Sequence, residues 1–215
     1  MKKKSETLLI PGPVGNLEIR IKPSVHDVDS GKAVVISHPH PLYGGTMNNK
    51  VVTTMERAFS SLGYTTVAYN FRGVGGSDGD YDSGIGEKAD LKAVLDWLSS
   101  SYEVSHTVLA GFSFGSFVSL SALAKSKVNA ICTVAPPVGL YDFSVINDVD
   151  VPWTLIQGGQ DEVVSAQEIL DWAMKQKSKP DIYWRDGASH FFQSEVVWLR
   201  KNIERSYCDE LILVC

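Results

Sequence analysis

The sequence predicts an α/β fold with a mainly parallel sheet of about eight strands and helices on both faces. Short apolar runs alternate with segments of helical apolar spacing through most of the chain, which is typical of parallel strands joined by right-handed crossovers. Several of these runs, such as 33–37, are continuously apolar, as in strands buried on both faces. The 215 residues fit one domain, 1–215, with a sizeable core.

The elements follow in order along the chain. Residues 8–10 and 17–21 indicate two strands joined by the turn formers of 11–16, an antiparallel edge. The expected elements after them are strand 33–37, helix 49–62, strand 65–71, helix 89–98, strand 107–110, helix 114–124, strands 128–134 and 153–157, helix 169–174, strand 182–184 and helix 191–203. The apolar end, 211–215, could add an edge strand, pack on the body or contact a partner.

Charge and cysteine content exclude several classes of function. A net charge of −5 and a pI near 5.5 argue against a nucleic-acid partner, because phosphate binding needs a basic face. The lysines at 2–4 are followed by an apolar run that ends at Pro11, too short for a signal peptide, and no run is long enough to span a membrane. Three cysteines without metal spacing favour a reduced, cytoplasmic protein.

A serine between two glycines carries the first chemical signal. Gly111-Phe112-Ser113-Phe114-Gly115 follows an apolar strand and opens a helix. A serine at such a junction sits on a strained turn, where glycines two residues before and after it avoid steric clashes. The turn exposes the hydroxyl, and the Phe114 N–H points to where an attacked carbonyl oxygen would lie. Ser113 is therefore the candidate nucleophile.

A second glycine-rich stretch, residues 72–79, could be mistaken for a dinucleotide site. The fingerprint needs a third glycine where Asp78 stands, and the next helical pattern begins only near Glu87. A nucleotide site is therefore not expected here.

Two later loops supply a base and an acid for the serine. Asp161 follows strand 153–157 and His190 follows strand 182–184, so both should lie with Ser113 at the carboxyl edge of the sheet. The order serine, acid, histidine along the chain strengthens the prediction. Asp161 could instead only cap the next helix, Glu162 is its nearest competitor, and His190 could be a surface histidine.

The chain resembles the α/β-hydrolases from the first hairpin to the last helix. Residues 38–49, 70–77 and 111–115 are similar to those of small bacterial serine hydrolases near dienelactone hydrolase and the prolyl-oligopeptidase catalytic domain. That resemblance implies a carboxylesterase or acyl hydrolase. True dienelactone hydrolases have a cysteine at the position of Ser113, which counts against that specific activity. Only residues 136–152 separate the sixth strand from the seventh, so no cap domain is expected.

The second oxyanion donor should come from the loop after strand 33–37. The family pattern aligns His40 with the donor, while the inserted prolines leave Leu42 and Tyr43 as alternatives, because proline has no N–H. His38 and His40 also form a His-x-His pair, a weak metal pattern without a nearby third ligand. Tyr43 and Phe112 either line an apolar acyl pocket or pack in the core.

The expected activity is hydrolysis of small carboxylic esters through an acyl-enzyme on Ser113, with no cofactor and no metal. Thioesters and small amides suit the same groups. A binding protein that kept the fold without catalysis is the rival from another class, and a peptidase would usually need an added domain. The expected partner is a small-molecule ester or thioester, not a nucleic acid or a membrane; the oligomeric state is left open.

Overall fold

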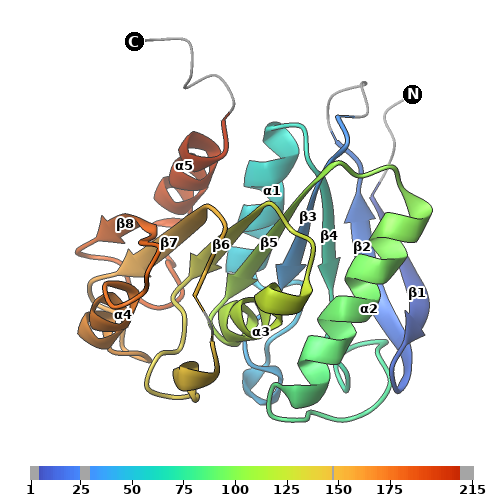
Figure 1. The fold of residues 1–215 in the computed structure, drawn as a ribbon, viewed down its shortest axis with the longest axis horizontal. Helices are drawn as coiled ribbons and strands as arrows, with labels where there is room; N and C mark the ends of the chain where they lie inside the picture. The colour runs from blue at the N-terminus through green and yellow to red at the C-terminus, as the bar shows by residue number, and fades with distance from the viewer. Residues whose placement is uncertain (1–4, 25–29, 147, 209–215) are drawn as a thin grey trace.

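A single eight-stranded sheet, in the order β1-β2-β4-β3-β5-β6-β7-β8, runs through the computed structural model, which describes residues 5–24, 30–146 and 148–208 (Figure 1). The strands are β1 Glu6–Gly12, β2 Gly15–Lys22, β3 Lys32–Ser37, β4 Thr65–Tyr69, β5 His106–Phe112, β6 Ala130–Val134, β7 Trp153–Gly158 and β8 Asp181–Arg185. β2 is antiparallel to β1 and to β4, and every other pairing is parallel. The predicted mainly parallel α/β sheet is confirmed.

The first hairpin is longer than the sequence pattern indicated. Pro11 pairs with Asn16 and Gly12 with Gly15, so the ladder of β1 and β2 continues into the segment read as a loop. Pro11 is tolerated because β1 is an edge strand, where one face of hydrogen bonding stays open. The hairpin thus closes one side of the sheet.

Helices cover both faces of the sheet. They are α1 Lys50–Ser61, α2 Ile85–Ser101, α3 Phe114–Ala122, α4 Ala166–Ala173 and α5 Val196–Ser206, with single 3₁₀ turns η1 Pro41–Tyr43, η2 Leu123–Lys125 and η3 Phe143–Val145. Along β3, Val35 belongs to the core cluster that includes residues of α2, α3 and α4, whereas Ile36 belongs to the cluster that includes residues of α1 and α5. Alternate residues of each central strand therefore pack in two separate cores, one on each face of the sheet. Figure 1 shows the helical layers that cover the two faces.

The final helix begins later than predicted. Residues 191–195 form turns, and α5 starts only at Val196. Phe192 has a φ of 49°, which a right-handed helix cannot include, and its ring is fully buried and stacks on Trp198. Burial of the Phe192 ring thus holds its backbone in the left-handed region, which delays the start of α5. The apolar spacing could not reveal this.

The loop 72–79 is held by packing and charge. Arg72 forms a buried ion pair with Asp90, 2.8 Å between Nη2 and Oδ1, and the Asp78 carboxylate accepts the backbone N–H of Asn16 at 2.6 Å. The glycines therefore serve a turn that joins β4 to the hairpin and to α2.

Two expectations concern the chain beyond this sheet. The apolar residues 211–215 lie outside the described residues, so their role stays a prediction. In the ranges that the structure describes, no helix is both long enough and apolar enough to cross a membrane.

Candidate active site

Ser113 stands on a strained turn between β5 and α3. Its φ of 52° and ψ of −120° lie in a region that non-glycine residues avoid. A Cβ on Gly111 would lie 2.4 Å from the backbone of Gly115, and one on Gly115 would lie 2.2 Å from the Ser37 oxygen. Both glycines are therefore steric requirements of the turn, as predicted from the Gly-x-Ser-x-Gly pattern.

A continuous chain of hydrogen bonds joins Ser113 to the two side chains predicted to assist it. His190 Nε2 lies 3.1 Å from Ser113 Oγ, and His190 Nδ1 lies 2.8 Å from Asp161 Oδ2. With Nδ1–H donating to the carboxylate, Nε2 is left to accept the serine proton. The three residues come from the loops after β5, β7 and β8, and His190 is only 1% exposed. The arrangement can therefore make the serine a nucleophile.

The Asp161 carboxylate is held from several directions. Its Oδ1 accepts the backbone N–H groups of Val163 and Val164, each at 2.9 Å, while Oδ2 faces His190. Burial of the carboxyl opposes ionisation, but the hydrogen bonds from His190 and from these two N–H groups hold the pKa of Asp161 below its ordinary value. The helix α4 that follows is capped by Ser165, so Asp161 shapes the loop rather than capping that helix.

Two neighbours add support that sequence reasoning did not assign. Glu162, considered only as a rival acid, accepts the backbone N–H of His190 at 3.0 Å through Oε2. Gln157, a fully buried residue of β7, donates from Nε2 to Asp161 Oδ2 at 3.0 Å. The sequence did offer a signal for Gln157: it is a polar residue near the end of an otherwise apolar strand.

The loop after β3 approaches the start of α3. Tyr43 N–H donates to the His40 carbonyl at 3.2 Å and Leu42 N–H donates to His40 Nδ1 at 3.1 Å, so both are occupied. The N–H groups of His40 and Phe114 donate no hydrogen bond to any described residue. The inclusion of Leu42 among the oxyanion donors is corrected, because its N–H is already engaged, and the role of His40 stays a prediction.

The two residues predicted to line a substrate pocket differ in position. Phe112 has no exposed area and packs in the core, its ring 5.1 Å from that of His190. The prediction that Phe112 contacts substrate is wrong, because this last residue of β5 is fully buried in the core with Val108 and Ala110. Tyr43 is 86% exposed and its ring lies 4.7 Å from that of His40, so its role stays a prediction.

The His-x-His pair does not gather metal ligands. His38 is fully buried, with Nδ1 donating to the Pro39 carbonyl at 2.6 Å and Nε2 accepting the Phe71 N–H at 3.0 Å. Burial lowers the pKa of His38 to about 4, so the ring is neutral. One ring nitrogen donates and the other accepts, and His38 has a structural role. Among the described residues no group of three or more His, Cys, Asp and Glu side chains could hold a metal ion.

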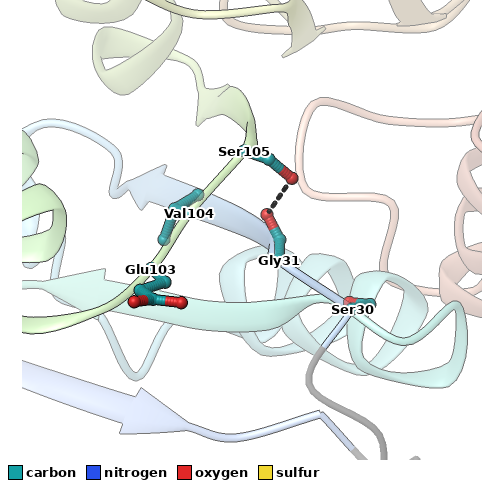
Figure 2. Close-up of a pocket in the computed structure, with 5 residues that line it drawn as sticks. All are labelled: Ser30, Gly31, Glu103, Val104 and Ser105. Atoms are coloured by element: carbon teal, nitrogen blue, oxygen red, sulfur yellow. Dashed lines mark hydrogen bonds between the residues drawn. The ribbon is translucent and has the colours of Figure 1, made fainter.

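The pocket drawn in Figure 2 lies away from this site. It is lined by Ser30 and Gly31, directly before β3, and by residues 103–105, directly before β5. Ser105 Oγ donates to the Gly31 carbonyl at 3.3 Å across it. Because β3 and β5 run parallel from there towards Ser37 and Phe112, the pocket is at the amino edge, opposite Ser113.

Comparison with known proteins places the chain in a family. Residues 21–148, more than half of the chain, match the X-Pro dipeptidyl-peptidase (S15) family. The chain belongs to the S15 family. A further relative is an uncharacterized protein of Rickettsia prowazekii (strain Madrid E), 36% identical over 202 residues that cover 89% of this S15 chain and 84% of that protein.

Solved structures match the chain along most of its length. An α/β serine hydrolase homologue from Coxiella burnetii has a TM-score of 0.91 at 43% identity, covering 94% of this chain and 97% of that one. An α/β serine hydrolase without lid from Xanthomonas campestris has a TM-score of 0.90 at 38% identity, covering 96% and 94%. The protein is therefore a hydrolase with the α/β serine hydrolase fold.

Proposed function

We propose that this protein is a serine esterase that cleaves small carboxylic esters through an acyl-enzyme on Ser113. The observation that carries the proposal is the hydrogen-bonded series Asp161, His190 and Ser113, with contacts of 2.8 and 3.1 Å. A serine hydroxyl is a weak nucleophile until a base removes its proton, and the base needs a carboxylate to fix its tautomer. These three side chains meet both requirements.

In the proposed reaction, His190 Nε2 takes the Ser113 proton as Oγ attacks the ester carbonyl. Asp161 stabilises the imidazolium that forms. His190 then gives its proton to the leaving alcohol oxygen, and the acyl group stays on Ser113. Water attacks this acyl-enzyme in the second half, with His190 again as base, which releases the acid and restores the serine.

The tetrahedral intermediates need two donors for the developing oxyanion. The N–H groups of Phe114 and His40 are assigned this role, because neither is engaged by a described residue while the loops that carry them are in contact. The ring centroids of His40 and Phe114 lie 5.3 Å apart, and Gly115 packs against the carbonyls of Ser37 and His38. Gly115 is thus required for the two donors to converge.

The connection between β6 and β7 is short, which favours small substrates that enter the site freely. In its described residues it contains one 3₁₀ turn, η3. Short-chain esters are the favoured class, and thioesters and small amides suit the same groups. The family assignment favours a second candidate, cleavage of a peptide bond after proline.

Hydrolysis of p-nitrophenyl esters of graded acyl length tests the proposal, with X-Pro p-nitroanilides in parallel. Wild type should prefer short esters, and Ser113→Ala should lose several orders of magnitude in kcat while remaining folded. A fluorophosphonate probe should label wild type and not Ser113→Ala. Exclusive turnover of the anilides would instead support the peptidase, and a folded protein that resists the probe would contradict both.

A further inference from the structure

A group of aromatic rings lies beside the proposed oxyanion donors and plays no part in the mechanism above. The His40 ring lies 4.7 Å from Tyr43, 4.9 Å from Tyr81, 5.3 Å from Phe114 and 6.3 Å from Tyr141. Tyr81 and Tyr141 also contact Phe114, at 5.8 and 5.4 Å. These five residues are termed the aromatic wall.

The aromatic wall is fixed at its base and open at its top. Phe114 is 1% exposed and anchors the wall at the residue after the nucleophile, whereas Tyr43 is 86% exposed. His40, Tyr81 and Tyr141 are each partly exposed. The Tyr81 and Tyr141 hydroxyl oxygens lie 3.5 Å apart, which ties the loop after β4 to the loop after β6. Partly exposed rings in fixed positions can accept a further ring against them.

The wall is built mainly from the side of β5 away from His190; Tyr141, from the loop after β6, joins it through its ring contacts with His40 and Phe114. In the sheet, β3 and β4, which precede His40 and Tyr81, lie on one side of β5, and β8, which precedes His190, lies on the other. The His190 ring contacts Phe112 and Phe191 instead, at 5.1 and 5.0 Å. The rings that contact His190 therefore differ from those of the aromatic wall.

This division distinguishes the two halves of an ester. His190 must protonate the departing oxygen, so the alcohol part leaves on the His190 side. The acyl part, with its carbonyl oxygen at the His40 and Phe114 N–H groups, is directed to the opposite side. On that side the acyl part would lie against the aromatic wall.

We propose that the aromatic wall is an acyl subsite that selects esters of small aryl-bearing carboxylic acids. This inference rests on the proposed esterase function and names its substrate class. Offset or edge-to-face stacking of an aryl group on Tyr81 and Tyr141 adds an attraction that a saturated ring of the same size lacks. Four rings around a histidine therefore favour an aryl group, which can stack on them, over a flexible alkyl chain.

Two matched substrates test the subsite: p-nitrophenyl 3-phenylpropanoate and p-nitrophenyl 3-cyclohexylpropanoate. They share the leaving group and the chain beside the carbonyl, so the ratio of their kcat/KM values reports the ring alone. Wild type should favour the phenyl ester about five- to tenfold. Tyr81→Leu and Tyr141→Leu should bring the ratio close to one, whereas Tyr81→Phe and Tyr141→Phe, which keep the ring, should preserve it.

Tyr102→Leu is the matched control, because Tyr102 ends α2 and packs on Trp97, away from the wall. It should leave the ratio unchanged. A wild-type ratio near one, in an enzyme that hydrolyses both esters, would overturn the subsite and leave the esterase proposal standing. No turnover of either ester, with Ser113 unlabelled by the fluorophosphonate, would refute the proposed function and the subsite with it. The wild-type ratio decides the matter even where a leucine variant does not fold.

Discussion

The carboxylate of Glu162 accepts the backbone N–H of His190 at 3.0 Å, while the carboxylate of its neighbour Asp161 lies 2.8 Å from the ring of the same histidine. Adjacent acids therefore hold one residue at two points, its main chain and its imidazole. The close approach of the two loops makes this possible, because a Cβ on Gly158 would lie 2.4 Å from the Ala188 oxygen. In the proposed mechanism Asp161 is the acid that supports the imidazole, while Glu162 holds the main chain of His190 in place.

The first prediction separates these two acids. Asp161→Ala should lower kcat on the order of 10⁴-fold, because the imidazole loses the partner that sets its tautomer and stabilises its charge. Glu162→Ala should lower kcat only about two- to tenfold, the effect of one hydrogen bond. Steady-state kinetics with a short p-nitrophenyl ester measures both. Equal losses in the two variants would mean that Glu162 shares the role given to Asp161.

The second prediction concerns Gln157, which donates to Asp161 Oδ2 at 3.0 Å. Gln157→Glu places a second negative charge against the pair of Asp161 and His190, so a proton is bound more tightly there. The acid limb of the kcat/KM profile should move up by about one pH unit. Gln157→Met, which has similar length and no charge, is the control and should move the limb far less. An unshifted limb in a folded Gln157→Glu protein would rule out this coupling.

Much of this site follows from local sequence rules. Ser113, Asp161 and His190 each come directly after a recognisable apolar strand, and the carboxyl ends of parallel strands share one edge. Those two facts suffice to predict that the residues lie close together. The central strands could also be predicted from the sequence. Because they are buried on both faces, they are continuously apolar with few polar interruptions.

Other features depend on tertiary packing that a linear pattern does not contain. Phe112 is adjacent to the nucleophile yet packs in the core with Val108 and Ala110 of the same strand, on the face of the sheet that α1 and α5 cover. Tyr81 and Tyr141 are 60 positions apart and meet only through the fold. The choice between His40 and Leu42 required knowing which backbone N–H groups were already engaged.

The third prediction tests the glycines of the nucleophile turn. A Cβ on Gly115 would lie 2.2 Å from the Ser37 carbonyl oxygen, a backbone atom that cannot move aside cheaply. Gly115→Ala should therefore destabilise the fold by about 3 kcal/mol or more and separate the proposed oxyanion donors. Gly187→Ala is the matched control, since a Cβ there meets nothing within 4 Å. Urea unfolding compares the two, and equal stability would contradict the steric argument.

The last prediction is a loss of stability in mild acid caused by His38. Burial lowers the pKa of His38 from 6.5 to about 4 in the folded protein. The unfolded chain therefore binds the proton first, so the contribution is fully present above pH 6.5 and is lost progressively as pH falls to about 4. The expected loss is about 3 kcal/mol in the free energy of unfolding. Protonation of Nε2 also removes the acceptor for the Phe71 N–H.

Urea unfolding of wild type and His38→Gln at several pH values from 7 to 4 isolates this contribution. Other groups that titrate in this range affect both proteins, so the difference between the two curves reports His38. That difference should shrink by about 3 kcal/mol as the pH falls, because the variant has no proton to gain at this position. NMR titration of the His38 ring provides a direct check. A folded-state midpoint near 6.5 would show that burial does not hold this imidazole neutral, and the acid sensitivity would then arise elsewhere.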